Sequence, residues 1–69
     1  MRIVVTHDDG WIVVRRGRVA VVCNVSASRL AVPVDGSPQA ALLASARGFV
    51  YADGVVELDG ESVVVVELA

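Results

Sequence analysis

The sequence predicts a small all-β domain, a sandwich or barrel of about seven short strands. Seventeen of the 69 residues are valine, which loses rotamer freedom in helices and favours strands. Every glycine falls at a break between short valine-rich runs, and four glycines follow aspartate. Asp-Gly favours hairpin turns because both residues tolerate positive φ. Short strands separated by regular turn signals are typical of a sandwich or barrel.

The valine-rich runs define the expected strands. They are Arg2 to Thr6, Trp11 to Arg16, Arg18 to Val25, Leu30 to Val34, Ala40 to Ser45, Val55 to Leu58 and Ser62 to Leu68, with a brief strand at Phe49 to Tyr51. The stretch VVELDGESVVVVEL predicts the clearest hairpin, with its turn at Asp59-Gly60. The run Val63 to Val66 is apolar on both faces of a strand, which predicts burial on both sides or contact with a partner.

One segment, SPQAALLASA at residues 37–46, favours a helix by local propensity. Ser37 suits an N-cap, Pro38 suits the first helical position, and alanine and leucine are strong helix formers. Because tertiary packing can override propensity, the sequence of this segment alone does not decide between a helix and a strand.

Composition bounds the class of protein. The length predicts one domain, residues 1–69. A hydrophobic content of 55% exceeds what a small soluble domain needs, which indicates a surface that something else covers. The net charge of -2 argues against a nucleic-acid partner, and apolar runs of at most five residues argue against a membrane span or secretory signal. A single cysteine favours a reducing compartment, so we expect a cytoplasmic protein.

The basic stretch RRGR, residues 15–18, has two interpretations. A phosphate or nucleic-acid site would need converging side chains, whereas Arg15 and Arg16 on a strand point to opposite faces. Gly17 supplies a turn, so we expect a solvated hairpin tip here.

No other polar cluster predicts catalysis, a metal or a cofactor. The stretch HDD, His7 to Asp9, is contiguous, whereas metal ligands usually converge from separate elements, so a loop between the first two strands is expected. Cys23 lies in a valine-rich strand and is expected to be a buried small hydrophobe. Asn24-Val25-Ser26 matches a glycosylation sequon, but Asn24 is expected to bond the backbone of the following turn.

Aromatic and acidic side chains are the remaining candidates. Trp11 and Tyr51 are candidates for stacking on a sugar, although core or interface packing is favoured for them and for Phe49. The aspartates Asp35, Asp53 and Asp59 are expected in turns. The glutamates Glu57, Glu61 and Glu67 belong to the expected terminal hairpin and form no acid-base pair.

The ordered series of strands carries a family resemblance. The stretch WIVVRRGRVAVVCNVSASRLAVPV, followed by AALLASARG and GVVELDGESVVVVEL, resembles the C-terminal β-domain of the α-amylase clan, glycoside hydrolase family 13. Within that family it is most similar to the malto-oligosyltrehalose trehalohydrolases. The resemblance implies an antiparallel Greek-key β-sandwich of about seven strands, with a strand at residues 40–45. The sequence departs from the family at Asp59-Gly60, where the family has a proline-containing link. It also begins with its own Met1, so both a fragment of a longer enzyme and a free-standing relative stay possible interpretations.

The resemblance also implies a function. The chain would be a non-catalytic accessory domain that packs on the catalytic (β/α)₈ barrel of a parent enzyme and stabilises it, while the catalytic carboxylates lie on the barrel. The parent would release trehalose from a malto-oligosaccharide. Two alternatives stay open. One is an α-glucan-binding module using Trp11 or Tyr51, and the other is a self-associating module that uses the same apolar surface. Weak self-association of the isolated chain is expected.

Overall fold

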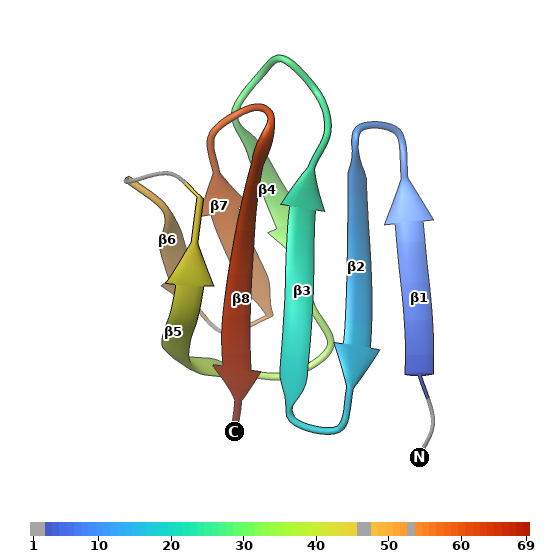
Figure 1. Ribbon diagram of the computed structural model, residues 1–69, viewed down its shortest axis with the longest axis vertical. Coiled ribbons are helices and arrows are strands. Elements are labelled where there is room, and N and C mark those ends of the chain that lie inside the picture. The colour runs from blue at the N-terminus through green and yellow to red at the C-terminus, as the bar shows by residue number, and fades with distance from the viewer. Residues whose placement is uncertain (1–2, 46–47, 53) are drawn as a thin grey trace.

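The chain folds into two antiparallel β-sheets stacked as a sandwich, which confirms the predicted all-β Greek-key class. The computed structural model describes residues 3–45, 48–52 and 54–69. One sheet has five strands in the order β1-β2-β3-β8-β5, and the other has three in the order β4-β7-β6. In Figure 1 the five-stranded sheet lies toward the viewer, and the start of β1 and the C-terminus lie at its lower end.

The described residues form eight strands, where about seven were expected together with a brief one at Phe49 to Tyr51. They are β1 Ile3–Asp8, β2 Trp11–Arg16, β3 Val19–Asn24, β4 Leu30–Pro33, β5 Pro38–Ala44, β6 Val50–Ala52, β7 Val55–Leu58 and β8 Ser62–Leu68. The first strand runs past the expected end at Thr6, because His7 and Asp8 pair with Ile12 and Trp11. The expected loop at HDD is therefore wrong, and the turn consists of residues 9 and 10.

Tight turns join the first three strands. Asp8 pairs with Trp11, and Arg16 pairs with Val19, so each connection has two residues. Gly17 in the second turn has a φ of 60°, a conformation that costs glycine little and other residues more. The prediction that RRGR turns a hairpin is confirmed, with β3 beginning at Val19 instead of Arg18.

The Asp-Gly pairs behave less uniformly than expected. Asp9-Gly10 closes the β1–β2 hairpin, because Asp8 pairs with Trp11, and β6 and β7 pair as far as Ala52 and Val55. The predicted hairpin at Asp59-Gly60 is wrong, because β7 and β8 lie in different sheets. Asp35-Gly36 also crosses between the sheets, from β4 to β5. An Asp-Gly pair predicts that the chain turns. It does not predict which sheet the next strand joins, because that depends on the strand with which it pairs.

The Asp59-Gly60 crossover needs glycine because there is no room for a side chain at residue 60, and not because of the φ angle of that residue. The left-handed residue in this turn is Glu61, with a φ of 54°. A Cβ on Gly60 would lie 2.5 Å from the carbonyl carbon of Ala27 and 2.6 Å from its oxygen. The β3–β4 loop therefore packs against the crossover at a distance that only glycine allows.

The helix-prone segment forms strand β5, as the family resemblance implied. Pro38, Ala41 and Ala44 pair with Leu68, Val66 and Val64 of β8, with register shifts after Pro38 and after Ala41. The backbone N–H of Ser45 then donates to the carbonyl of Val63 at 2.8 Å. Pairing with β8 supplies partners for backbone groups, and this tertiary ladder overrides local propensity.

The core is built almost entirely of valine and leucine. Its buried apolar members are Val13, Ala20, Val22, Val32, Val34, Val56, Leu58, Val64, Val66 and Leu68. They come from the facing sides of both sheets, and Trp11, Leu30, Phe49 and Tyr51 pack around them. Small β-branched side chains fill a thin sandwich without a buried aromatic centre.

Candidate docking face

The side of the five-stranded sheet that points away from the three-stranded sheet is almost wholly apolar. Opposed residues of antiparallel strands share a face, so the register assigns each side chain. The apolar residues of the outer face are Ile3 and Val5 of β1, Ile12 and Val14 of β2, Val19, Val21 and Cys23 of β3, Val63 and Val65 of β8, and Ala40 and Leu43 of β5. Its polar residues His7, Arg16 and Glu67 stand in the two end rows.

The middle row of the outer face crosses all five strands without a polar side chain. It runs Val5, Val14, Val21, Val65, Leu43. Leu43 is 72% exposed, Ile3 60% and Val5 56%. No described element covers this side of the sheet, which faces the viewer in Figure 1. Contiguous exposed apolar surface of this kind marks an interaction site.

A shallow hollow lies over one part of the outer face. Its volume is about 510 Å³, and Ile3, Val14, Arg16, Val19 and Val21 line it. Arg16 is the one charged residue among them, and it stands at the end of β2. The hollow gives the outer face relief into which side chains of a partner can pack.

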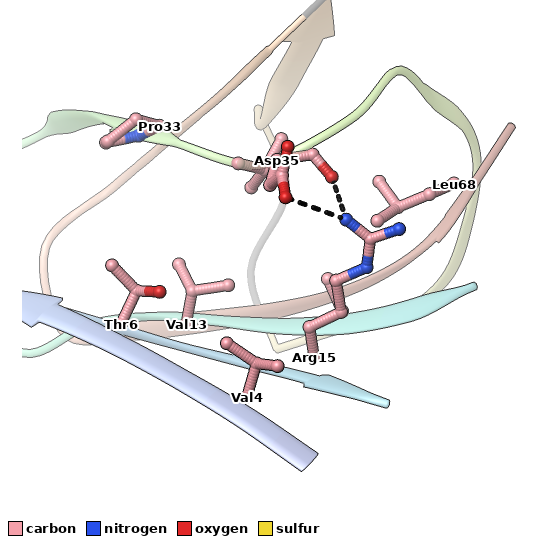
Figure 2. A pocket seen from close by; sticks show the side chains of 9 residues that line it. Val4, Thr6, Val13, Arg15, Pro33, Asp35 and Leu68 are labelled. Atoms are coloured by element: carbon pink, nitrogen blue, oxygen red, sulfur yellow. Dashed lines mark hydrogen bonds and ion pairs between the residues drawn. The ribbon is translucent and has the colours of Figure 1, made fainter. Parts of the chain in front are cut away.

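A second hollow, of about 520 Å³, opens on the inner side where the small sheet leaves β1 and β2 partly uncovered. Figure 2 shows Val4, Thr6 and Val13 on one wall and Pro33 on the other. Arg15 lies at its mouth and donates to the backbone carbonyls of Asp35 and, at 3.0 Å, Gly17. Its guanidinium also lies 3.5 Å from the Asp35 carboxylate.

The two arginines of RRGR separate as predicted. Arg15 lies on the wall of the inner hollow, whereas Arg16 borders the hollow on the outer face. They form no joint anion clamp. Arg15 instead ties the β2–β3 hairpin to the β4–β5 crossover.

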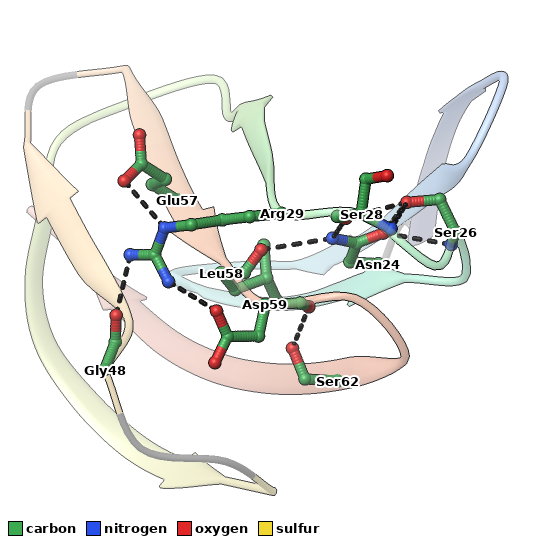
Figure 3. A network of polar contacts seen from close by, with 9 residues as sticks. All are labelled: Asn24, Ser26, Ser28, Arg29, Gly48, Glu57, Leu58, Asp59 and Ser62. Atoms are coloured by element: carbon green, nitrogen blue, oxygen red, sulfur yellow. Dashed lines mark hydrogen bonds and ion pairs between the residues drawn. The ribbon is translucent and has the colours of Figure 1, made fainter.

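A buried amide connects the two sheets. Asn24, 1% exposed, donates from Nδ2 to the carbonyls of Ser28 at 2.8 Å and Leu58 at 3.1 Å (Figure 3). Its Oδ1 accepts from the backbone N–H of Ser26 at 3.0 Å and from its hydroxyl at 2.8 Å. The predicted bond to the following turn is confirmed, and the sequon asparagine is inaccessible in the folded chain.

Arg29 organises a second polar cluster, which the sequence analysis did not single out. Its guanidinium bonds Glu57 at 2.9 Å, Asp59 at 2.7 Å and the carbonyl of Gly48 at 2.7 Å (Figure 3). The hydrogen bonds that Arg29 donates to Glu57 and then to Asp59 raise the pKa of Arg29 above its ordinary value. The spacing Glu57-x-Asp59 could have indicated this cluster, because alternate residues of a strand lie on the same face and two carboxylates there favour a cation between them. The cluster holds the β3–β4 loop, β7 and the segment before β6 together.

The aromatic candidates pack on the core. Trp11 pairs with buried Asn24, and Tyr51 pairs with buried Val56, so both side chains take the inner faces of their sheets. Each is half-buried against the core cluster. Phe49 and Tyr51 stack with ring centroids 6.4 Å apart. These positions are those of core-edge side chains, as favoured from the sequence.

The remaining candidates stay apart from one another. Cys23, expected to be buried, is only half-buried because it lies on the outer face. Within residues 3–45, 48–52 and 54–69, no three His, Cys, Asp or Glu side chains are grouped to hold a metal ion. The candidate Asp53 lies outside the described residues. The described ranges contain no helix long and apolar enough to cross a membrane.

Comparison with known proteins places the chain in a family. The family described as "Domain of unknown function (DUF3459)" matches residues 1–65. No curated protein and no solved structure matches the chain. The match spans nearly all of the sandwich, including the apolar residues of the outer face. The chain therefore belongs to the DUF3459 family, a domain found at the C-terminus of α-amylase-family (glycoside hydrolase family 13) enzymes.

Proposed function

We propose that the chain is a non-catalytic accessory domain of a cytoplasmic, malto-oligosyltrehalose trehalohydrolase-like enzyme. It packs on the catalytic (β/α)₈ barrel through its outer face and stabilises that barrel. The observation that carries this proposal is the uncovered apolar row from Val5 to Leu43. Family membership supplies the partner, because the domain is found in chains that carry a catalytic barrel.

The chemistry of the outer face suits permanent docking better than sugar binding. Removing apolar surface from water contributes about 25 cal/mol per Å², and this face offers little but apolar side chains. An α-glucan presents hydroxyl groups that need hydrogen-bond partners when they are buried. The outer face provides such groups only in its end rows, from His7, Arg16 and Glu67.

The mass of the native protein tests whether a barrel is attached. An antibody against this domain should detect, in the source cell, a species several times heavier than 7.2 kDa. A native species of 7.2 kDa would contradict the proposal. Partner or sugar binding would then become the leading question.

The substrate of the parent enzyme tests the finer assignment. A trehalohydrolase releases trehalose from malto-oligosyltrehalose, so the purified parent should produce trehalose from that substrate. A parent that cleaves only malto-oligosaccharides would be a sibling amylase, and the trehalose assignment would fall. The barrel-docking role would survive that result.

A titration of the 69-residue chain with maltoheptaose tests the sugar-binding alternative. Saturable chemical-shift changes at Trp11 or Tyr51 would favour a binding module. No shift at millimolar sugar is the expected result, because both rings pack on the core.

A further inference from the structure

Strand β1 forms an edge of the five-stranded sheet that is open to a further strand. Within the described residues β1 pairs only with β2, and all six of its residues are exposed. Ile3, Val4 and Val5 are 60%, 47% and 56% exposed. The free edge offers unpaired backbone N–H and C=O groups, which are a template for strand addition.

The other three sheet edges carry features that hinder strand addition. β5 begins at Pro38 and has two register shifts. β4 has four residues and ends at Pro33, and β6 has only three residues. Proline, bulges and short length are the usual protections of an edge. The sequence of β1, IVVTHD, contains neither proline nor lysine, and its ladder with β2 is regular.

We propose that β1 pairs antiparallel with β1 of a second copy of this chain, around a twofold axis at Val5. A twofold axis that relates antiparallel neighbours stands perpendicular to the sheet, so both outer faces lie on the same side. Val5 then stands opposite Val5 of the second copy, and Ile3 stands opposite His7. Two five-stranded sheets become one ten-stranded sheet.

One feature selects this register. The apolar middle row of each copy ends at Val5, so pairing Val5 with its copy continues the row across both sheets. The pairing uses the backbone edge of the sheet, whereas barrel docking uses the outer face, so variants of the two surfaces distinguish them.

Sedimentation of the 69-residue chain from micromolar to millimolar concentration tests the proposal with two matched variants. Val5→Lys and Leu43→Lys place the same charge in the same apolar row, at opposite edges of the sheet. We expect a concentration-dependent dimer in the unmodified chain and in Leu43→Lys, and its loss in Val5→Lys. Loss in both variants would indicate association through the outer face and would overturn the edge pairing. A monomer at every concentration would overturn it as well.

A crosslink tests the register even if Val5→Lys disturbs β1. Directly opposed residues of antiparallel strands have Cβ atoms about 4.5–5.5 Å apart, near the span of a disulfide. In a Cys23→Ser background, Val5→Cys should therefore give a disulfide-linked dimer on mild oxidation, and Leu43→Cys should not. Equal crosslinking of the two variants would contradict the proposed twofold axis.

Discussion

The two faces of the five-stranded sheet carry the same kind of residue but differ in what covers them. On β8, Val64 and Val66 point inward and are 1% and 0% exposed, whereas their neighbour Val63 points outward and is 37% exposed. The three-stranded sheet covers the inner face, and no described element covers the outer one. The apolar residues, 55% of the chain, therefore form both a buried core and the outer face of the five-stranded sheet. Composition alone does not show which of these two surfaces a given valine belongs to.

Adjacent residues of β8 give the largest expected difference between the faces. Val64→Asp places a carboxylate in the core and should cost about 4 kcal/mol or more, comparable with the roughly 3–10 kcal/mol that holds a domain of this size folded. Val63→Asp puts the same group on the open outer face and should cost about 1 kcal/mol, through lost strand propensity. Urea unfolding of the two variants measures both values. Equal losses would show that the outer face is packed within the chain itself.

Removal of the amide that joins the sheets should have the next largest effect. Asn24→Ala leaves the Leu58 carbonyl and the β3–β4 loop without their buried partner, at a cost of about 3 kcal/mol. The matched control is Gln39→Ala, an exposed amide bonded to Glu67 at 3.1 Å, which should change unfolding by less than about 0.5 kcal/mol. Similar losses of unfolding free energy in the two variants would contradict the role of Asn24 as a link between the sheets.

The glycines of two turns should respond for different reasons. Gly60→Ala forces a Cβ against the backbone of Ala27 and should cost about 2 kcal/mol through strain. Gly17→Ala meets no atom within 4 Å but keeps a φ of 60°, so a cost of about 1 kcal/mol is expected. Thermal unfolding checks the order. A larger loss at Gly17 would mean that the β3–β4 loop yields to the added methyl group.

Arg29 should give the smallest effect, because its cluster is exposed to solvent. Arg29→Ala removes bonds to Glu57, Asp59 and the Gly48 carbonyl, yet exposed ion pairs are weak and screened by salt. We expect a small fall in Tm that shrinks as salt rises. Arg29→Lys keeps the charge and loses the planar fork, so it should recover part of the loss. A salt-independent fall would assign the effect to packing of the side chain.

Strand positions could be predicted from the sequence because valine runs and glycine breaks are local signals. The sheet that each strand joins could not, and β7 and β8 show why. Their sequence satisfies the hairpin pattern, but each finds a better partner elsewhere, β7 between β4 and β6 and β8 between β3 and β5. Pairing of this kind depends on residues far apart in the chain. The strand at β5 likewise came from the family resemblance and against local propensity.

The sequence predicted that the chain has more apolar residues than its core needs, but it did not predict where on the surface they gather. The hydrophobic content and the doubly apolar run at Val63 to Val66 both indicated a covered surface. Only the register shows that Val5, Val14, Val21, Val65 and Leu43 form one row. Arg29 was missed because its carboxylate partners lie 28 and 30 residues away along the chain.

The proposal that a catalytic barrel covers the outer face is tested most directly at Cys23, which lies on that face in the central strand β3. The measurement is the rate of Cys23 alkylation, identified by peptide mass spectrometry, in the 69-residue chain and in the intact parent enzyme. We predict strong protection in the parent, reversed when Val63→Asp is introduced there. Equal rates in the two proteins would contradict a docked outer face.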